Sequence, residues 1–209
     1  MNIERLSIGK PKELLHSGSS FTSAIAKNEA QEIYAGKTII QGDEVANKQF
    51  HGGEDRVICA YPFEHYAYWE QVLGSPLQHA AFGENLTVSN GKEDAVQIGD
   101  IYQAGEAIVE LSQGRYPCIT INKYNSSPLL LNKIFETGYT GYFFRVIKPG
   151  MISRDSKVTL LERKPNSLTP SFIHRIFFHD RSNKEAIRQI LALEWLADDW
   201  TNKFRKLIS

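Results

Sequence analysis

Short apolar runs, each bounded by Gly, Asn, Asp or Pro, occupy the chain up to about residue 162 and constrain its fold most strongly. Runs of this length with turn residues between them are typical of strands joined by tight connections. Residues 103–107 and 148–150 have the composition of hairpin turns. We therefore predict a mostly β domain, an antiparallel sheet curled towards a barrel, with strands at residues 23–27, 36–41, 56–61, 85–88, 107–112, 141–147 and 157–163.

Two helices are predicted among the strands. Residues 62–74 begin with Pro62, place large apolar side chains at helical spacing and stop at Gly74. Residues 127–138 offer Ser127 as a cap, a proline at the start and Gly138 at the end. A few helices should therefore accompany the β domain.

The pattern changes after residue 164, where three helical segments follow one another without a strand between them. Thr169 and Pro170 start the first, Ser182 and Glu185 form a capping box for the second, and Trp200 belongs to the apolar face of the third. We predict a β domain over residues 1–164 and a small three-helix unit over 165–209. About 45 residues are too few for an independent core, so this unit should pack on the β domain or on a second subunit, which would make the chain a homodimer.

Charge and hydropathy exclude several classes of partner. Lys plus Arg equals Asp plus Glu at 24 each, so no general attraction to a nucleic acid polymer or an acidic membrane is expected. No run approaches the roughly 20 apolar residues of a membrane-spanning helix, and the first residues do not resemble a signal peptide. A cytoplasmic location is therefore expected.

The common nucleotide and metal motifs are missing from the sequence: it has no G-x-x-x-x-G-K-[ST], G-x-G-x-x-G, C-x-x-C or H-E-x-x-H pattern. Pyridoxal phosphate binding is likewise not expected. The chain has two cysteines, Cys59 and Cys118, and a reducing compartment gives them little use as a disulfide. Any chemistry must come from a less common arrangement.

A first candidate segment is "HGGEDR", which contains His51, Gly52, Gly53, Asp55 and Arg56. Paired glycines let backbone N–H groups approach an anion closely, with a histidine and an arginine beside them. Alternatively, the glycines form a tight turn whose histidine and aspartate cap strand ends. Taken alone, this segment leaves both interpretations open.

Cys118 is the second candidate, because it follows Pro117 and lies three residues after Arg115. A nearby cation favours the thiolate, the form that attacks electrophiles and binds metals, although the arginine could equally point to solvent. Cys59 lies in an apolar run and is interpreted as a small buried hydrophobe.

The segment "FGENLTV" raises a similar choice, since its polar side chains could serve a ligand or their own backbone. Its candidate residues are Gly83, Glu84 and Asn85.

Taken together and in order, these segments resemble the MOSC-domain family, named for the C-terminal domain of molybdenum cofactor sulfurase, and specifically its stand-alone bacterial YiiM-like branch. The resemblance rests on "HGGEDRVICAYP", "FGENLTV", "IGDIYQAGEAIVELSQGRYPC", "TGYTGYFFRVIKPG" and the helical tail, and covers nearly the whole chain. It implies a β-barrel-like domain and a molybdenum cofactor, a molybdopterin whose dithiolene holds the metal.

The resemblance also implies roles for the candidate residues. Cys118 would be the catalytic thiolate and the protein ligand to molybdenum, since thiolate is a soft donor. The pocket for the pterin and its phosphate would be lined by His51, Gly52, Gly53, Asp55, Arg56, Gly83, Glu84, Asn85 and Arg115. Related proteins more often have proline at the position of Gly114, which implies a more flexible loop before the cysteine in this chain.

Three functions follow as hypotheses. The leading one is a molybdenum-dependent reductase that detoxifies N-hydroxylated compounds such as hydroxylamino purines. Its electrons would come from a separate reductase partner, because the sequence has no iron–sulfur or dinucleotide pattern. One alternative is a sulfur carrier or cofactor-binding module that holds a persulfide on Cys118 without turnover. The other is a thiol enzyme that uses Cys118 with His51 as base.

Overall fold

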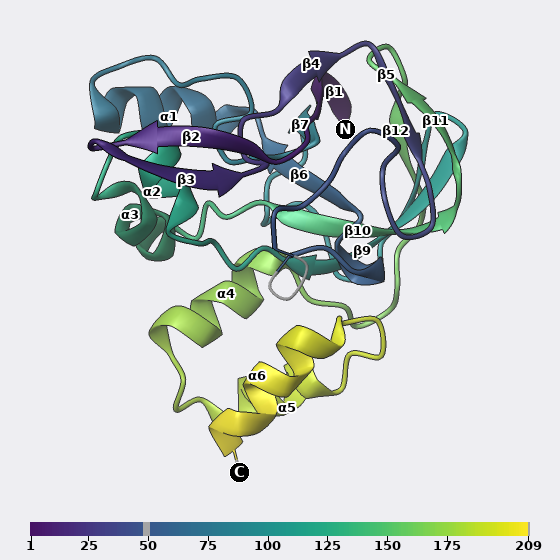
Figure 1. The fold of residues 1–209 in the computed structure, drawn as a ribbon. Helices are drawn as coiled ribbons and strands as arrows, with labels where there is room; N and C mark the ends of the chain where they lie inside the picture. The colour runs from purple at the N-terminus through teal and green to yellow at the C-terminus, as the bar shows by residue number, and fades with distance from the viewer. Residues whose placement is uncertain (48–50, 209) are drawn as a thin grey trace.

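An eight-stranded, strongly curled sheet forms the body of the molecule (Figure 1). The computed structural model describes residues 1–47 and 51–208. Neighbouring strands pair antiparallel except β6 and β7, which run parallel because a helix connects them. In spatial order the strands are β12 (Val158–Glu162), β8 (Ile101–Ala104), β9 (Ala107–Gly114), β10 (Tyr142–Lys148), β6 (Ile58–Pro62), β7 (Leu86–Ser89), β1 (Asn2–Ile8) and β4 (Asn28–Ala30).

The curl brings the first strand back to the last one. The amino group of Met1 donates to the Val158 carbonyl oxygen at 3.0 Å, and the Val158 N–H donates to the Met1 carbonyl oxygen at 3.2 Å. Two small sheets complete the β structure, one pairing β5 (Glu32–Ala35) with β11 (Gly150–Ser153) and one pairing β2 (Lys12–His16) with β3 (Ser19–Ser23). The predicted barrel-like β domain is confirmed.

Three helices gather at one end of the sheet around a separate core. They are α1 (Glu64–Leu73), α2 (Thr120–Tyr124) and α3 (Leu130–Thr137). Trp69 is fully buried in this core, and its Nε1–H donates to the Tyr61 hydroxyl at 2.6 Å. Helices α1 and α3 end at Gly74 and Gly138, as the sequence predicts. Both glycines adopt the left-handed backbone conformation that is typical of a helix C-terminus.

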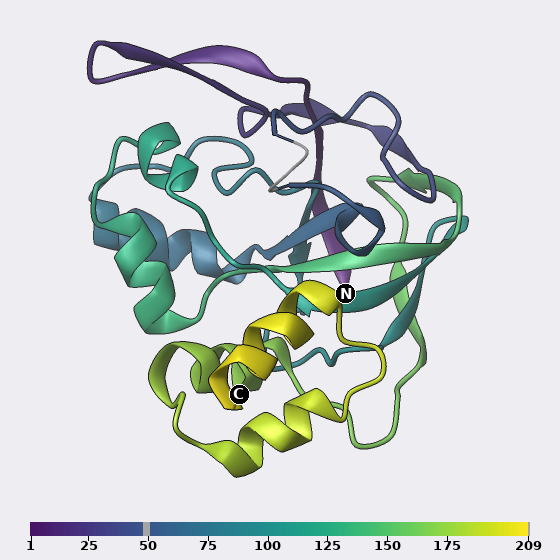
Figure 2. The ribbon, with the colours of Figure 1, turned by 60° about the horizontal axis from the view of Figure 1, so that its bottom comes forward.

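The last three helices lie together below the sheet (Figure 2). They are α4 (Pro170–His179), α5 (Lys184–Leu191) and α6 (Asp198–Ile208). Their buried faces belong to the same apolar cluster as the inside of the sheet, including Ile173, Trp200 and Phe204. The helical unit was expected to pack on the β domain or on a second subunit. In the structure, the apolar faces of its three helices pack on the β domain.

Several local predictions are wrong, and each for a packing reason. Residues 23–27 and 36–41 do not form the predicted strands. They lie mostly in loops, from which Ile25 packs into the core around α1 and Ile40 packs into the main core. Pro62 ends β6 rather than starting α1. Ser127 does not cap α3, which begins at Leu130, and α5 is capped by Asn183 instead of Ser182.

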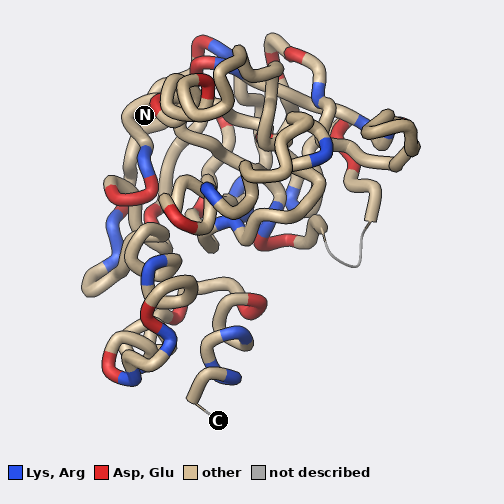
Figure 3. The backbone as a smooth tube through the Cα atoms, turned by 90° about the vertical axis from the view of Figure 1, so that its left-hand side faces the viewer, with Lys and Arg blue, Asp and Glu red and all other residues tan. Residues whose placement is uncertain are grey.

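Charged residues of both signs are interspersed along the chain (Figure 3), in line with the balanced composition. Within residues 1–47 and 51–208, the helices are too short or too polar to cross a bilayer.

Candidate functional site

Cys118 lies in an irregular segment between β9 and α2. The strand ends at Gly114, the Arg115 N–H donates to the Gly141 carbonyl oxygen at 3.0 Å, and Pro117 brings no N–H that would need a partner. The Cys118 carbonyl oxygen then accepts the Ile121 N–H at 3.1 Å and so starts α2. The thiol is therefore held where the backbone turns from the sheet into a helix.

The surroundings of Cys118 favour its thiolate. Burial alone would raise the pKa of this partly buried thiol, but hydrogen bonds from His51 and Thr120 and the positive charge of Arg115 outweigh it and lower the pKa to about 6. Most of the thiol is therefore ionised at neutral pH, which is the state needed in a nucleophile or a metal ligand.

Alkylation of the cofactor-free protein by iodoacetamide should show this ionisation. A lowered pKa means that thiolate is already present above pH 6, so the rate at Cys118 should rise with a midpoint near pH 6 and level off by about pH 7.5. Peptide mapping by mass spectrometry distinguishes it from Cys59. The variant His51→Ala should move the midpoint upward, whereas a wild-type midpoint above about pH 8 would rule out the assigned hydrogen bonds.

Cys59 has the opposite environment, as expected of a structural residue. It is buried in β6, and burial raises the pKa of its thiol even though the Arg115 guanidinium lies near it. The Arg115 Nη1 atom is 3.8 Å from the Cys59 sulfur. Arg115 thus points inward, towards both cysteines, and not into solvent.

The first motif forms a glycine turn and the short 3₁₀ helix η1 (Glu54–Arg56). Gly52 and Gly53 have φ angles of 83° and 97°, which favour glycine strongly, and the Arg56 N–H donates to the Gly53 carbonyl oxygen at 2.9 Å. The Asp55 carboxylate accepts from Arg145 Nε at 2.8 Å and is tied to the sheet. His51 of this motif donates a hydrogen bond to Cys118.

The second motif is buried and satisfied by the protein itself. Glu84 is fully buried, and its carboxylate accepts from the Phe82 N–H at 3.2 Å, the Thr87 hydroxyl at 3.1 Å and the Tyr66 hydroxyl. The preceding Gly83 has a φ of 75° and leaves only 3.1 Å between an added Cβ and Ile25. These two residues hold the turn before β7.

Asn85 joins three segments behind Cys59. Its Oδ1 accepts the Cys59 N–H at 3.0 Å, and its Nδ2 donates to the Ser7 carbonyl oxygen and to Asp43 Oδ2, each at 3.1 Å. Asp43 in turn forms a buried ion pair with Lys27. Every polar atom of the Asn85 side chain is therefore used within the fold.

The structure thus brings part of the predicted set together. His51 donates a hydrogen bond to Cys118, and Arg115 is near enough for its charge to act on that thiol. Asn85 contacts Cys59 instead, and Glu84 contacts Tyr66, Phe82 and Thr87. Sequence reasoning missed Thr120, whose position two residues after the cysteine at a helix start was a usable signal. It also missed the Lys27–Asp43 pair, for which the local sequence gives no signal.

Comparison with known proteins agrees with this fold. Residues 47–159 match the family model "MOSC domain", and residues 171–209 match "YiiM-like, 3-alpha helix domain". The chain therefore belongs to the MOSC-domain family. Its architecture, with the helical unit after the β domain, is that of the YiiM-like members.

Individual relatives cover most of the chain. The uncharacterized protein YflK of Bacillus subtilis is 39% identical over 202 residues, covering 96% of this chain and 91% of YflK. The crystal structure of YiiM from Geobacillus stearothermophilus has a TM-score of 0.85 at 36% identity, covering 100% of this chain and 99% of that one. A protein named "Reductase" from Gibberella moniliformis is 36% identical over 151 residues, which are 70% of this chain but 27% of the fungal protein.

Proposed function

We propose that this chain is a molybdenum-cofactor-dependent reductase of N-hydroxylated compounds such as hydroxylamino purines, with the Cys118 thiolate as the protein ligand to molybdenum. The observation that carries the proposal is Cys118 itself. In a chain of the MOSC-domain family, the structure holds this partly exposed thiol by His51 and Thr120, with Arg115 nearby, so that its pKa is lowered to about 6.

The donor set fits a cofactor that brings its own metal ligands. Among the described residues, no group of three or more His, Cys, Asp or Glu side chains lies close enough together to hold a metal ion. A metal already bound by a dithiolene needs little more from the protein than one soft donor, and a thiolate meets that need. Cys118 can provide it.

In this proposal the cofactor supplies two-electron and oxygen-atom chemistry when it is bound. For the substrate, the N–O bond breaks, two electrons and two protons are taken up, and the oxygen leaves as water. Cys118 would be the protein ligand to the metal, and the hydrogen bonds from His51 and Thr120 would hold its thiolate in position. The backbone N–H groups of the Gly52–Gly53 turn and the Arg56 side chain would receive the phosphate of the pterin.

We propose that the two electrons come from a separate reductase protein. Support comes from the fungal relative named "Reductase", in which the matching region is 27% of a much longer chain. This chain carries no motif for iron–sulfur or dinucleotide binding of its own. The N-hydroxylated substrate and the electron donor would therefore meet on a domain that holds only the molybdenum cofactor.

Metal and pterin content of the purified protein test the proposal. Wild-type protein from a cofactor-producing host should contain molybdenum and pterin in a near-equimolar amount, and Cys118→Ser should lower the molybdenum by at least about tenfold because a hydroxyl is a poor substitute for the soft thiolate. The matched control is Cys59→Ser, which changes the buried cysteine that the proposal leaves without a metal role and should keep its molybdenum.

Two results would overturn the proposal. Full molybdenum content in Cys118→Ser would remove Cys118 from the ligand role. A persulfide on Cys118 in a molybdenum-free wild type, detected as a mass increase of one sulfur atom, would establish the sulfur-carrier alternative. With molybdenum present, turnover of a hydroxylamino purine with a chemical reductant in excess tests the substrate class.

A further inference from the structure

The segment that carries Cys118 is attached to the C-terminal helices as well as to the sheet. The indole Nε1–H of Trp200, in α6, donates to the Gly114 carbonyl oxygen at 2.7 Å, and both the indole and Gly114 are buried. Just before this point, the Ala197 N–H donates to the Ser112 carbonyl oxygen at 3.0 Å. The end of β9 is thus fixed by the start of α6.

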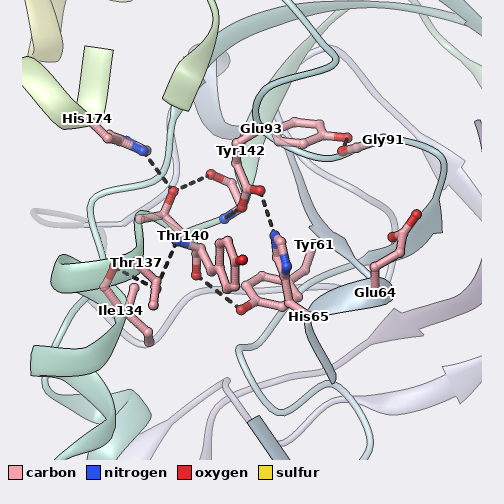
Figure 4. A network of polar contacts seen from close by, with 12 residues as sticks. Tyr61, Glu64, His65, Gly91, Glu93, Ile134, Thr137, Thr140, Tyr142 and His174 are labelled. Carbon is pink, nitrogen blue, oxygen red and sulfur yellow. Dashed lines mark hydrogen bonds and ion pairs between the residues drawn. The ribbon is translucent and has the colours of Figure 1, made fainter. Parts of the chain in front are cut away.

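Helix α4 reaches the same segment through His174. The ring lies so close to Gly114 that a Cβ added there would be 2.4 Å from its Nε2 and Cε1 atoms. On its other side the Nδ1 atom is 2.9 Å from the Thr140 hydroxyl, which donates to the Gly141 carbonyl oxygen (Figure 4). That carbonyl also accepts the Arg115 N–H, so α4 supports the segment from two directions.

The protonation of His174 follows from these contacts. The His174 Nδ1 atom is hydrogen-bonded to the Thr140 hydroxyl, and Nε2 has no hydrogen-bond partner in the described structure. Burial lowers the pKa of this ring to about 3, so it is neutral at neutral pH. A neutral ring can pack closely against Gly114 without bringing a charge to the Cys118 segment.

Tyr116 extends the contact between the segment and the helices. Its ring centroid is 5.8 Å from that of Phe178 and 6.3 Å from that of Trp200, and Lys203 Nζ lies 5.6 Å from the Tyr116 ring centroid. Two residues before Cys118, the side chain therefore lies against α4 and α6.

We infer that the three-helix unit positions the Cys118 segment, with Trp200 as its main positioning residue, so that the thiolate is held in place for its ligand. This inference rests on the proposed function for the identity of the ligand. It assigns to the helical unit a role at the site itself, although none of its residues needs to touch the cofactor. The main observation is that two helices of the unit contact Gly114. Trp200 in α6 donates a hydrogen bond to its carbonyl oxygen, and the His174 ring of α4 fills the space next to its Cα.

The substitution Trp200→Phe tests the inference, because it keeps an aromatic ring and removes the N–H donor. Trp69→Phe is the matched control: Trp69 is also fully buried and also donates one hydrogen bond of similar length, but to Tyr61 in the other core. Three measurements apply to both variants, namely Tm, hydrogen exchange of the peptide over residues 111–118, and the rate at which bound molybdenum is lost during dialysis.

Both variants should lower Tm to a similar extent. Only Trp200→Phe should increase hydrogen exchange in residues 111–118 and the rate of molybdenum loss, each by about five- to tenfold, the factor expected for one lost hydrogen bond. If the two variants had equal effects on exchange and on molybdenum loss, Trp200 would only stabilise the fold and would not position the Cys118 segment. That result would overturn the inference. A wild type without molybdenum would instead contradict the proposed function, while the exchange data still decide whether Trp200 anchors the segment.

Discussion

Replacing Glu93 by alanine is expected to lower the free energy of unfolding by about 3–5 kcal/mol, because it leaves two buried groups without their hydrogen-bond partner at roughly 1–3 kcal/mol each. Glu93 Oε2 is 2.7 Å from His65 Nε2, and both side chains are 4% exposed. Its Oε1 accepts the Gly141 N–H at 2.7 Å, so the substitution leaves two buried polar groups without a partner (Figure 4). For a chain of this length, Tm should fall by roughly 10 °C.

Chemical denaturation and calorimetry measure this effect, and two variants serve as controls. Glu93→Gln keeps an oxygen acceptor for Gly141 and should recover a large part of the loss. Glu136→Ala removes a carboxylate whose ion pair with Lys133 is exposed, and it should change stability little. If Glu93→Ala were as mild as Glu136→Ala, the buried network would contribute far less than its geometry implies.

The fold was predictable where local pattern and tertiary packing agree. The runs around β6, β9 and β10 are strands because their apolar residues lie on the sheet, and helix α4 begins at the predicted Thr169 cap, whose side-chain oxygen accepts the Phe172 N–H. The pattern failed where loops supply core residues. Ile25 and Ile40 are buried like strand residues, yet their backbones turn, and nothing local distinguishes the two cases.

The site was predictable only in part for a related reason. Arg115 and Cys118 are close in sequence, so their mutual effect could be inferred, whereas the contact of His51 with Cys118 joins residues 67 apart and came from the family resemblance. Polar residues of the second motif are buried, and a sequence does not show whether a buried Asn serves a ligand or the backbone. The pocket roles of all nine residues stay predictions, namely those of His51, Gly52, Gly53, Asp55, Arg56, Gly83, Glu84, Asn85 and Arg115.

The expected loop before Cys118 does not include Gly114, which is the buried last residue of β9. It pairs with Tyr142 in β10 and accepts the Trp200 hydrogen bond. Its φ angle is not positive, so the glycine is required by the space that His174 occupies and not by backbone conformation. Any residue with a Cβ at this position would therefore need a smaller or displaced side chain in place of His174.

This dependence predicts a specific coupling between two substitutions. Gly114→Ala should lower the free energy of unfolding by about 3 kcal/mol, the upper end for overpacking, since the His174 ring is held by Thr140 and by aromatic neighbours and cannot move away freely. His174→Ala removes the ring and leaves a cavity, which is also destabilising. In the double variant the new methyl group enters the space that the ring has left.

Equilibrium denaturation of the four proteins measures the coupling as a double-mutant cycle. The double variant should be more stable than the sum of the two single losses predicts, by about 1–3 kcal/mol. Because Gly114 also begins the Cys118 segment, alkylation of Cys118 should be altered in Gly114→Ala and largely restored in the double variant. Additive losses would mean that the ring and the glycine do not compete for the same space, and the close approach of α4 to the cysteine segment would then have no energetic consequence.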